Sequence, residues 1–393
     1  MFRRKLKIGY FVLTGLNAYA TAFYFDYLFF QMRLDFGFGN AGNFFLATLN
    51  GLVYVPAAWW AGRFAQKSGY FLALRVGFGL MALALAAGSR LPGVASQFVV
   101  MLAWTIGMCF TWPTLEGLIS ERETRAGLAQ MLGIYNVVWA AGSALAYFTG
   151  GALLENLGRG SLFWLPVGMH VGQLGIVWWL ERSAGRTKDA ATLQPVPEII
   201  AATPVESGRT AGRRAFLRMA WLANPFAYIA MNTAIPIMPD LAARLELSTT
   251  FAGFVCSVWM FTRLFTFVGL WCWPAWHYRF GWLAGSYVLM IASFAVLFLV
   301  PVLWVIVAAQ IVFGIAVGLI YYSSLFYSMD VGETKAEHGG LHEAAIGAGM
   351  FAGPLVGFAT LYFAPGLAHA SIWTVSSLLI AGFCGMLTLK RKG

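Results

Sequence analysis

The chain has 393 residues, of which 60% are hydrophobic and only 11% are charged, and its mean hydropathy is +0.71. A soluble domain carries about 25% charged residues, so this composition excludes a soluble globular protein and indicates an integral membrane protein. The formal net charge of +10 follows from membrane topology, and it gives no reason to expect a nucleic-acid partner.

Apolar runs of about 20 residues, the length that an α-helix needs to cross a bilayer, recur along the whole chain. Twelve runs are predicted, so the fold class is an all-α polytopic membrane protein with both termini on one side. Their approximate bounds are 8–32, 43–64, 70–90, 94–118, 126–155, 159–181, 214–243, 249–275, 281–300, 302–329, 340–364 and 367–389.

Lys and Arg are distributed unevenly over the loops between these runs. Of the 26 Lys and Arg, 21 fall on the side of the termini, and four fall on the other side: Arg33, Arg90, Arg159 and Arg244. Cytoplasmic loops carry the excess of Lys and Arg. We therefore expect both termini to be cytoplasmic, in the bacterial inner membrane. The remaining cation, Arg263, lies inside a membrane run.

Hydrophobicity falls between Glu181 and Arg213, where polar, Gly and Pro residues accumulate. This pattern predicts an N-terminal six-helix half at 1–181, a cytoplasmic linker at 182–213 and a C-terminal six-helix half at 214–393.

The two halves are related at a nearly constant offset of 211 residues. The offset pairs Arg33-Leu34-Asp35 with Arg244-Leu245-Glu246, and Gly142 with Gly353. Parallel repeats of this kind occur in transporters whose halves rock about a central site.

Several of these features together resemble the major facilitator superfamily over essentially the full length of the chain. One is the twelve-helix plan with a central cytoplasmic loop. Another is 62–69, GRFAQKSG, which looks like the family's G-x-x-x-D-R-x-G loop, with Gln66 in place of the aspartate. Its counterpart in the second half is 278–281, YRFG, and 349–357, GMFAGPLVG, looks like the family's G-x-x-x-G-P-x-x-G pattern.

The resemblance implies a secondary transporter, a symporter or antiporter, that works by alternating access. It also implies that the first, fourth, seventh and tenth helices line a central cavity. The gating-loop positions that it assigns are Gly62, Lys67, Gly69 and Arg279.

Arg263 lies about 20 Å from either end of its run at 1.5 Å per residue, which is too deep for its side chain to reach water easily. Trp259 and Thr266 share its helix face. One interpretation is that the guanidinium holds a substrate carboxylate or phosphate through two hydrogen bonds. The resemblance points the same way, because some carboxylate carriers of the superfamily use an arginine in the eighth helix. The alternative is a permanent salt bridge that ties the two halves together.

Acidic residues inside the membrane runs are candidates for proton coupling, because ionisable groups there are usually functional. Asp26 is the first candidate, and Glu116 and Glu343 are the others. The alternative for Asp26 is a structural hydrogen bond to Tyr19 or another tyrosine. Asp240 and Asp330 lie near helix ends, where we expect solvated or capping roles.

Polar and aromatic residues at helical spacing mark candidate cavity walls and suit a small polar organic solute. The alternative is that they are ordinary hydrogen-bonding partners between packed helices. The candidate substrate-binding residues are Arg263, Asn17, Thr21, Tyr24, Trp112, Tyr135, Asn136, Trp139, Tyr228, Asn232, Trp259, Tyr321 and Ser324.

The sequence therefore predicts a secondary transporter for a small polar anionic solute, coupled to protons and acting as a monomer in the lipid bilayer. Efflux of amphipathic drugs or lipids is an alternative, and a receptor or scaffold that does not transport is another. An enzyme is not expected, because the sequence has no convergent nucleophile, base and metal set. No cofactor or metal is expected, and the four cysteines within predicted helices favour buried free thiols.

Overall fold

The computed structural model describes residues 2–121, 123, 125–191, 207–331, 335–367 and 369–392. Its elements are α1 (Phe2–Phe36), α2 (Asn40–Ser68), α3 (Tyr70–Gly88), α4 (Val94–Ser120), α5 (Arg125–Leu157), α6 (Ser161–Ala191), α7 (Ser207–Arg244), α8 (Thr249–Cys256), α9 (Val258–Cys272), the 3-10 helix η1 (Pro274–Trp276), α10 (Phe280–Leu299), α11 (Leu303–Val331), α12 (Lys335–Phe363) and α13 (Ala370–Lys392). Only Ser257 separates α8 from α9, so the two form one interrupted helix. The all-α fold with twelve long helices is confirmed.

Nine helical segments in the described residues are long and apolar enough to cross a membrane. The other three long helices are α1, α6 and α7, which carry polar residues such as Asn17, His170 and Asn224. These three side chains are fully covered by the bundle. Polar groups at membrane depth are tolerated where protein surrounds them.

The helices on either side of the central connection are longer than the apolar runs. α6 continues to Ala191 and α7 begins at Ser207, so both ends of the predicted linker at 182–213 are helical. A helix need not stop where the hydrocarbon ends, because its backbone hydrogen bonds also form in water. Residues 192–206 lie outside the described part of the chain.

Glycines at repeat-related positions allow equivalent helix crossings in the two halves. A Cβ on Gly142 of α5 would lie 2.7 Å from the Gly15 carbonyl oxygen of α1. A Cβ on Gly353 of α12 would lie 2.6 Å from the Ile229 carbonyl oxygen of α7. Small residues let membrane helices approach this closely, so the pairing read from the sequence corresponds to the same packing role in each half.

The two halves meet along two main seams. α2 packs against α12, and α5 packs against α8 and α9, while α7 also contacts α1 and α2. At the first seam, a Cβ on Gly51 would lie 2.6 Å from the Phe351 Cα. Under the repeat α2 corresponds to α8 with α9, and α5 corresponds to α12. The repeat therefore relates the two seams to each other: the contact of α2 with α12 is equivalent to the contact of α8 and α9 with α5.

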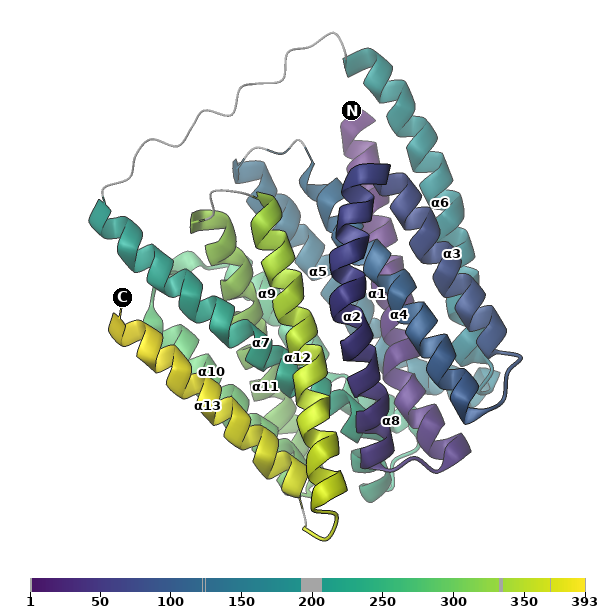
Figure 1. The fold of residues 1–393 in the computed structure, drawn as a ribbon, viewed down its shortest axis with the longest axis vertical. Helices are drawn as coiled ribbons and strands as arrows, with labels where there is room; N and C mark the ends of the chain where they lie inside the picture. The colour runs from purple at the N-terminus through teal and green to yellow at the C-terminus, as the bar shows by residue number, and fades with distance from the viewer. Residues whose placement is uncertain are drawn as a thin grey trace.

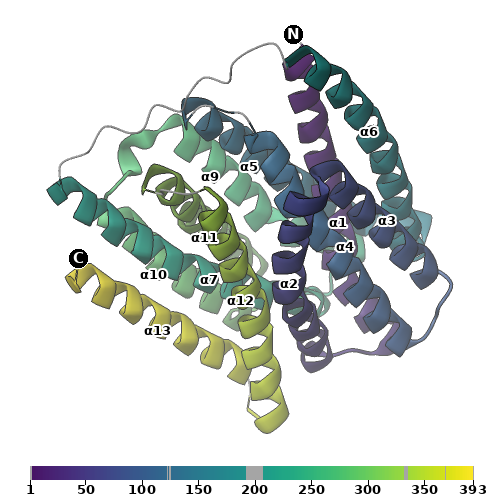
Figure 2. The ribbon, with the colours of Figure 1, turned by 45° about the horizontal axis from the view of Figure 1, so that its top comes forward.

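The molecule has two different ends. Both termini, the end of α6 and the start of α7 lie toward one of them, which we call the terminal end (Figure 1). Toward it the two halves diverge, with α6 and α7 leaning apart in both views (Figure 1, Figure 2). At the opposite end, called the far end, helices of the two halves converge.

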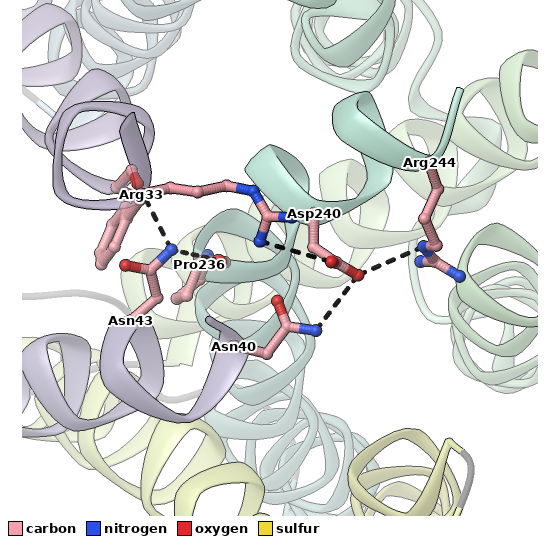
Figure 3. A network of polar contacts seen from close by, with 7 residues as sticks. Arg33, Asn40, Asn43, Pro236, Asp240 and Arg244 are labelled. Atoms are coloured by element: carbon pink, nitrogen blue, oxygen red, sulfur yellow. Dashed lines mark hydrogen bonds and ion pairs between the residues drawn. The ribbon is translucent and has the colours of Figure 1, made fainter. Parts of the chain in front are cut away.

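Polar side chains join the two halves at the far end (Figure 3). Asp240 of α7 accepts a hydrogen bond from Asn40 Nδ2 of α2 at 3.2 Å and pairs with Arg33 Nη1 of α1 at 3.4 Å. Arg244 of α7 contacts the same carboxylate through Nε at 3.2 Å. Asn43 Nδ2 donates to the Pro236 carbonyl oxygen at 3.1 Å. Asp240 was predicted to be solvated or to cap a helix. In the structure it also joins the second half to the first.

The four cysteines are free, as predicted, but only Cys109 and Cys256 are buried. The prediction of burial is wrong for Cys272 and Cys384, which are exposed on the surface of the bundle. An apolar run in a membrane protein has a lipid-facing side as well as a core side, and the run alone does not distinguish them.

Candidate functional site

A cavity of about 180 Å³ lies between the two halves. Its walls come from α1, α2, α4 and α5 of the first half and from α7, α9 and α12 of the second. The lining residues are Thr21, Ala22, Phe25, Asp26, Asn50, Trp104, Met108, Trp139, Ser143, Tyr228, Met231, Asn232, Ile235, Trp259, Met260, Arg263 and Met350. Such a concave, mostly apolar space with a few polar groups is typical of a small-molecule site.

Arg263 lies in the wall of this cavity and is 7% exposed. Its guanidinium carbon lies 4.8 Å from the centre of the Trp139 ring and 5.0 Å from that of Trp259. Nη1 lies 3.3 Å from the Met231 sulfur, a weak acceptor, and Nε has no hydrogen-bond partner among the described residues. The guanidinium is thus supported by two indole faces, and its hydrogen-bonding capacity is largely unused.

Close packing by α11 fixes the stem of Arg263. A Cβ on Gly314 would lie 3.1 Å from the Arg263 backbone nitrogen, and one on Gly318 would lie 3.4 Å from the Arg263 Cγ. The helix irregularity at Ser257 comes about two turns before Arg263, and interruptions of this kind are frequent at functional sites. The backbone around Arg263 is therefore held by neighbours that leave its head group facing the cavity.

A short chain of contacts orients the Trp139 ring. Trp139 Nε1 donates to Asn136 Oδ1 at 2.9 Å, and the Tyr321 hydroxyl lies 3.5 Å from the same oxygen. The Tyr321 and Trp139 ring centres are 5.6 Å apart in an edge-to-face arrangement. Asn136 and Trp139 belong to α5, whereas Tyr321 belongs to α11. These contacts span both halves, and they hold the indole over the guanidinium.

Asp26 of α1 lies in the wall of the same cavity and is 3% exposed. Its Oδ2 has no hydrogen-bond partner among the described residues. The Tyr19 hydroxyl bonds to Thr149 Oγ1 at 2.6 Å, so the structural tie between Asp26 and Tyr19 considered from the sequence is not formed.

Asp26 and Arg263 do not form an ion pair of 4.0 Å or less, although they line one cavity. Neither side chain forms an ion pair with any other charged side chain among the described residues. The permanent salt bridge considered from the sequence for Arg263 is therefore absent from the part of the chain that the structure describes.

The predicted binding residues fall into two groups. Six line the cavity: Thr21, Trp139, Tyr228, Asn232, Trp259 and Arg263. The others are not among its lining residues: Asn17, Tyr24, Trp112, Tyr135, Asn136, Tyr321 and Ser324. Within this second group, Asn17 Nδ2 donates to Thr111 Oγ1 at 3.1 Å, and Tyr24 packs its ring on Trp104 at 4.9 Å. These two make the helix-to-helix contacts named as the alternative.

The remaining acidic candidates lie elsewhere. Glu116 is half-buried toward the terminal end of α4 and is not among the lining residues. The side chain of Glu343 lies outside the described residues.

The gating-loop residues lie at the terminal end. Gly69 alone joins α2 to α3, and its φ of +96° suits glycine. Gly62 lies within the last turns of α2. Lys67 and Arg279 are exposed, and they form no ion pair with other described side chains.

Sequence reasoning missed the apolar part of the wall. Trp104 and the methionines Met108, Met231, Met260 and Met350 line the cavity. An apolar side chain in a membrane helix carries no signal that separates a cavity wall from the core or the lipid face. The missed residues include all four sulfur-bearing side chains of the wall.

Comparison with known proteins agrees with this architecture. A family model described as the Major Facilitator Superfamily matches residues 10–354. The chain belongs to the Major Facilitator Superfamily. This Major Facilitator Superfamily protein is therefore a transporter and not an enzyme. No curated protein matches the chain.

Solved structures show the same fold at low sequence identity. The nucleoside transporter NupG is 15% identical with a TM-score of 0.69, covering 98% of this chain and 99% of that one. A mutant of NupG gives 12% identity and a TM-score of 0.70, with the same coverage. A mutant of the peptide transporter POT in complex with sulfate is 13% identical with a TM-score of 0.74, covering 98% of this chain and 94% of that one.

Proposed function

We propose that this transporter carries a small organic solute with an anionic group, which Arg263 binds in the central cavity. The observation that carries the proposal is the buried guanidinium, which faces the cavity between two indole rings and has no carboxylate within 4.0 Å among the described residues. A buried cation without a partner is costly. An anionic group that enters the cavity supplies that partner through two parallel hydrogen bonds.

Asp26 is the proposed site of proton coupling. Its carboxyl group lines the same cavity and has an oxygen without a hydrogen-bond partner. A proton that binds to Asp26 together with the anion keeps the number of buried charges balanced. This arrangement supports symport of the solute with a proton.

The proposed orientation places the terminal end in the cytoplasm. The excess of Lys and Arg near that end supports it. Because the halves are joined at the far end and diverge at the terminal end, the structure then corresponds to a state whose outer side is closed. Alternating access requires a second state in which the contacts at the far end are released.

Substitution of Arg263 tests the anion site. In Arg263→Gln we expect the affinity for a transported anion to fall by about 2 kcal/mol or more, roughly thirtyfold, because a buried charge pair is lost. Arg263→Lys keeps the charge but not the forked geometry, and it should recover only part of the affinity. Ligand-induced shifts of the unfolding temperature across carboxylates, phosphates, nucleosides and peptides identify the ligand, and counterflow in proteoliposomes measures its transport.

The matched control is Arg90→Gln, which removes an exposed arginine outside the cavity. Equal affinity for every transported anion in Arg263→Gln and in the unsubstituted protein would exclude the anion site. Ligand binding without counterflow would favour the receptor or scaffold. A transport rate that ignores an imposed pH gradient would exclude proton coupling.

Efflux of amphipathic compounds is a second candidate function, and the apolar side chains of the cavity wall support it. Three tryptophans and four methionines line the cavity, and flexible thioethers adapt to varied apolar shapes. Under this function hydrophobic cations and neutral lipids would stabilise the protein more than acids do. Arg263→Gln would then leave their affinity unchanged.

A further inference from the structure

The cavity wall contains one acid and one base among its described residues, and they come from opposite halves. Asp26 lies on α1 of the first half, and Arg263 lies on α9 of the second half. Both are more than nine-tenths buried, and each has a polar atom without a partner, Asp26 Oδ2 and Arg263 Nε. The wall therefore has a negative and a positive pole that do not neutralise each other directly.

Two kinds of occupant balance these charges. An anion at Arg263 leaves Asp26 to be neutralised by a proton. A solute that carries both an anionic and a cationic group satisfies both poles with no added proton, because each buried charge then has an opposite charge beside it.

The side chains that share the wall with Asp26 suit a cationic group. The Phe25 and Trp104 rings, both in the wall, are stacked with centres 6.0 Å apart and an interplanar angle of 7°. Aromatic faces attract ammonium groups. Asn232 donates through Nδ2 to the Tyr228 carbonyl oxygen at 2.9 Å, so its Oδ1 is available in the wall as an acceptor.

We propose that the solute is a zwitterion whose anionic group binds Arg263 and whose cationic group binds Asp26, with an apolar body packed between the tryptophans and methionines of the wall. The inference rests on the anion site at Arg263 proposed above. For a zwitterion, the cationic group takes the place of the proton at Asp26, so transport of the zwitterion does not require that proton. A zwitterion bridges α1 and α9, and so it links the two halves. A solute with a single charge contacts only one of the two poles, so the zwitterion is the occupant that draws them together.

Charge-matched triads test the inference. Each triad consists of an amino acid, its acid without the amino group and its amine without the carboxyl group: phenylalanine with 3-phenylpropionate and 2-phenylethylamine, leucine with 4-methylpentanoate and 3-methylbutylamine, and the corresponding set for methionine. Dissociation constants are measured by calorimetry on the purified full chain. In at least one triad we expect the zwitterion to bind about tenfold or more tightly than its acid and its amine, because each pole adds a charge-assisted hydrogen bond.

Variants separate the two poles. In Asp26→Asn the advantage of the zwitterion over its acid should fall to about threefold or less, while the acid keeps its affinity. In Arg263→Gln both the zwitterion and the acid should lose affinity by roughly thirtyfold or more, as expected above for a transported anion. Glu181→Gln removes a half-exposed acid at the terminal end and serves as the charge-matched control for Asp26→Asn.

The outcomes distinguish this inference from the proposed function. If acids bind as tightly as their zwitterions in every triad and depend on Arg263, the second pole is wrong and the anion site stands. An unchanged zwitterion advantage in Asp26→Asn overturns the inference in the same way. If no acid or zwitterion depends on Arg263, the proposed function fails, and the inference fails with it.

Discussion

The far end and the terminal end differ in which helices their ion pairs connect. At the far end Asp240 of the second half contacts Arg33 and Asn40 of the first. At the terminal end each ion pair between described residues stays within one half: Lys7–Glu123 at 3.2 Å, Arg75–Glu181 at 2.8 Å and Arg213–Asp330 at 3.3 Å. Within the part of the chain that the structure describes, ion pairs therefore join the two halves only at the far end.

The far-end network also shows how a duplicated sequence becomes asymmetric. Arg33 and Arg244 are related by the repeat, and both contact Asp240. The position related to Asp240 in the first half is occupied by Phe29. The repeat thus supplies two cations and a single acid, so one carboxylate serves both arginines. Removal of Asp240 therefore breaks the ion pair between the two halves, and the repeat supplies no equivalent pair that could replace it.

The largest effect on the far end is expected from Gly151→Val. A Cβ at Gly151 of α5 would lie 2.7 Å from the Thr249 carbonyl carbon and 2.9 Å from the Thr250 Cα. Overpacking against this backbone costs about 1–3 kcal/mol, which corresponds to roughly 5- to 150-fold in population. The far end should open, and a cysteine introduced as Ser143→Cys in the cavity wall should react faster with an impermeant maleimide added on that side.

The control for this prediction is Gly168→Val in α6, where a Cβ meets nothing within 4 Å. The labelling is carried out with the exposed Cys272 and Cys384 replaced by serine. Equal labelling rates in Gly151→Val and Gly168→Val would show that the α5–α8 contact does not keep the far end closed.

Asp240→Asn should have a smaller effect on the same labelling. The side chain is 24% exposed, and ion pairs at such sites contribute about 1 kcal/mol or less. We expect an increase of up to about fivefold in far-side labelling, and raising the salt concentration should bring the unsubstituted protein toward the variant.

Asp35→Asn is the matched control, because Asp35 lies at the same end of the molecule but pairs with Arg159 within the first half. A labelling increase in Asp35→Asn equal to that in Asp240→Asn would mean that the loss of any acid at this end, and not the cross-half contact, opens the far end.

The smallest effect is expected from Arg75→Gln at the terminal end. Arg75 and Glu181 belong to α3 and α6 of the same half and are more than a third exposed. Removal of the pair should lower the unfolding temperature slightly and leave cavity labelling from both sides unchanged, because the contact does not join the halves. A clear change in labelling would contradict the distinction drawn between the two ends.

The amino-acid sequence is sufficient to predict the number of membrane helices, the repeat and the two most informative charges. Apolar runs give the helices because each backbone group in lipid must be bonded within its own segment. Asp26 and Arg263 stand out for a similar reason, since a charge at membrane depth needs an occupant or a partner. Helical spacing also placed Trp259 on the Arg263 face, where the structure has it.

The packing of the helices determines which polar residues share the cavity wall and which only join one helix to another. Asn136 was predicted to bind solute, but it bonds to Trp139 and Tyr321, and Asp240 was expected at a solvated helix end but joins the halves. Helical periodicity tells which residues share a face, but not which helix covers that face. The partner of Asp240 is about 200 positions away in the chain, and only the packing of two halves brings such residues together.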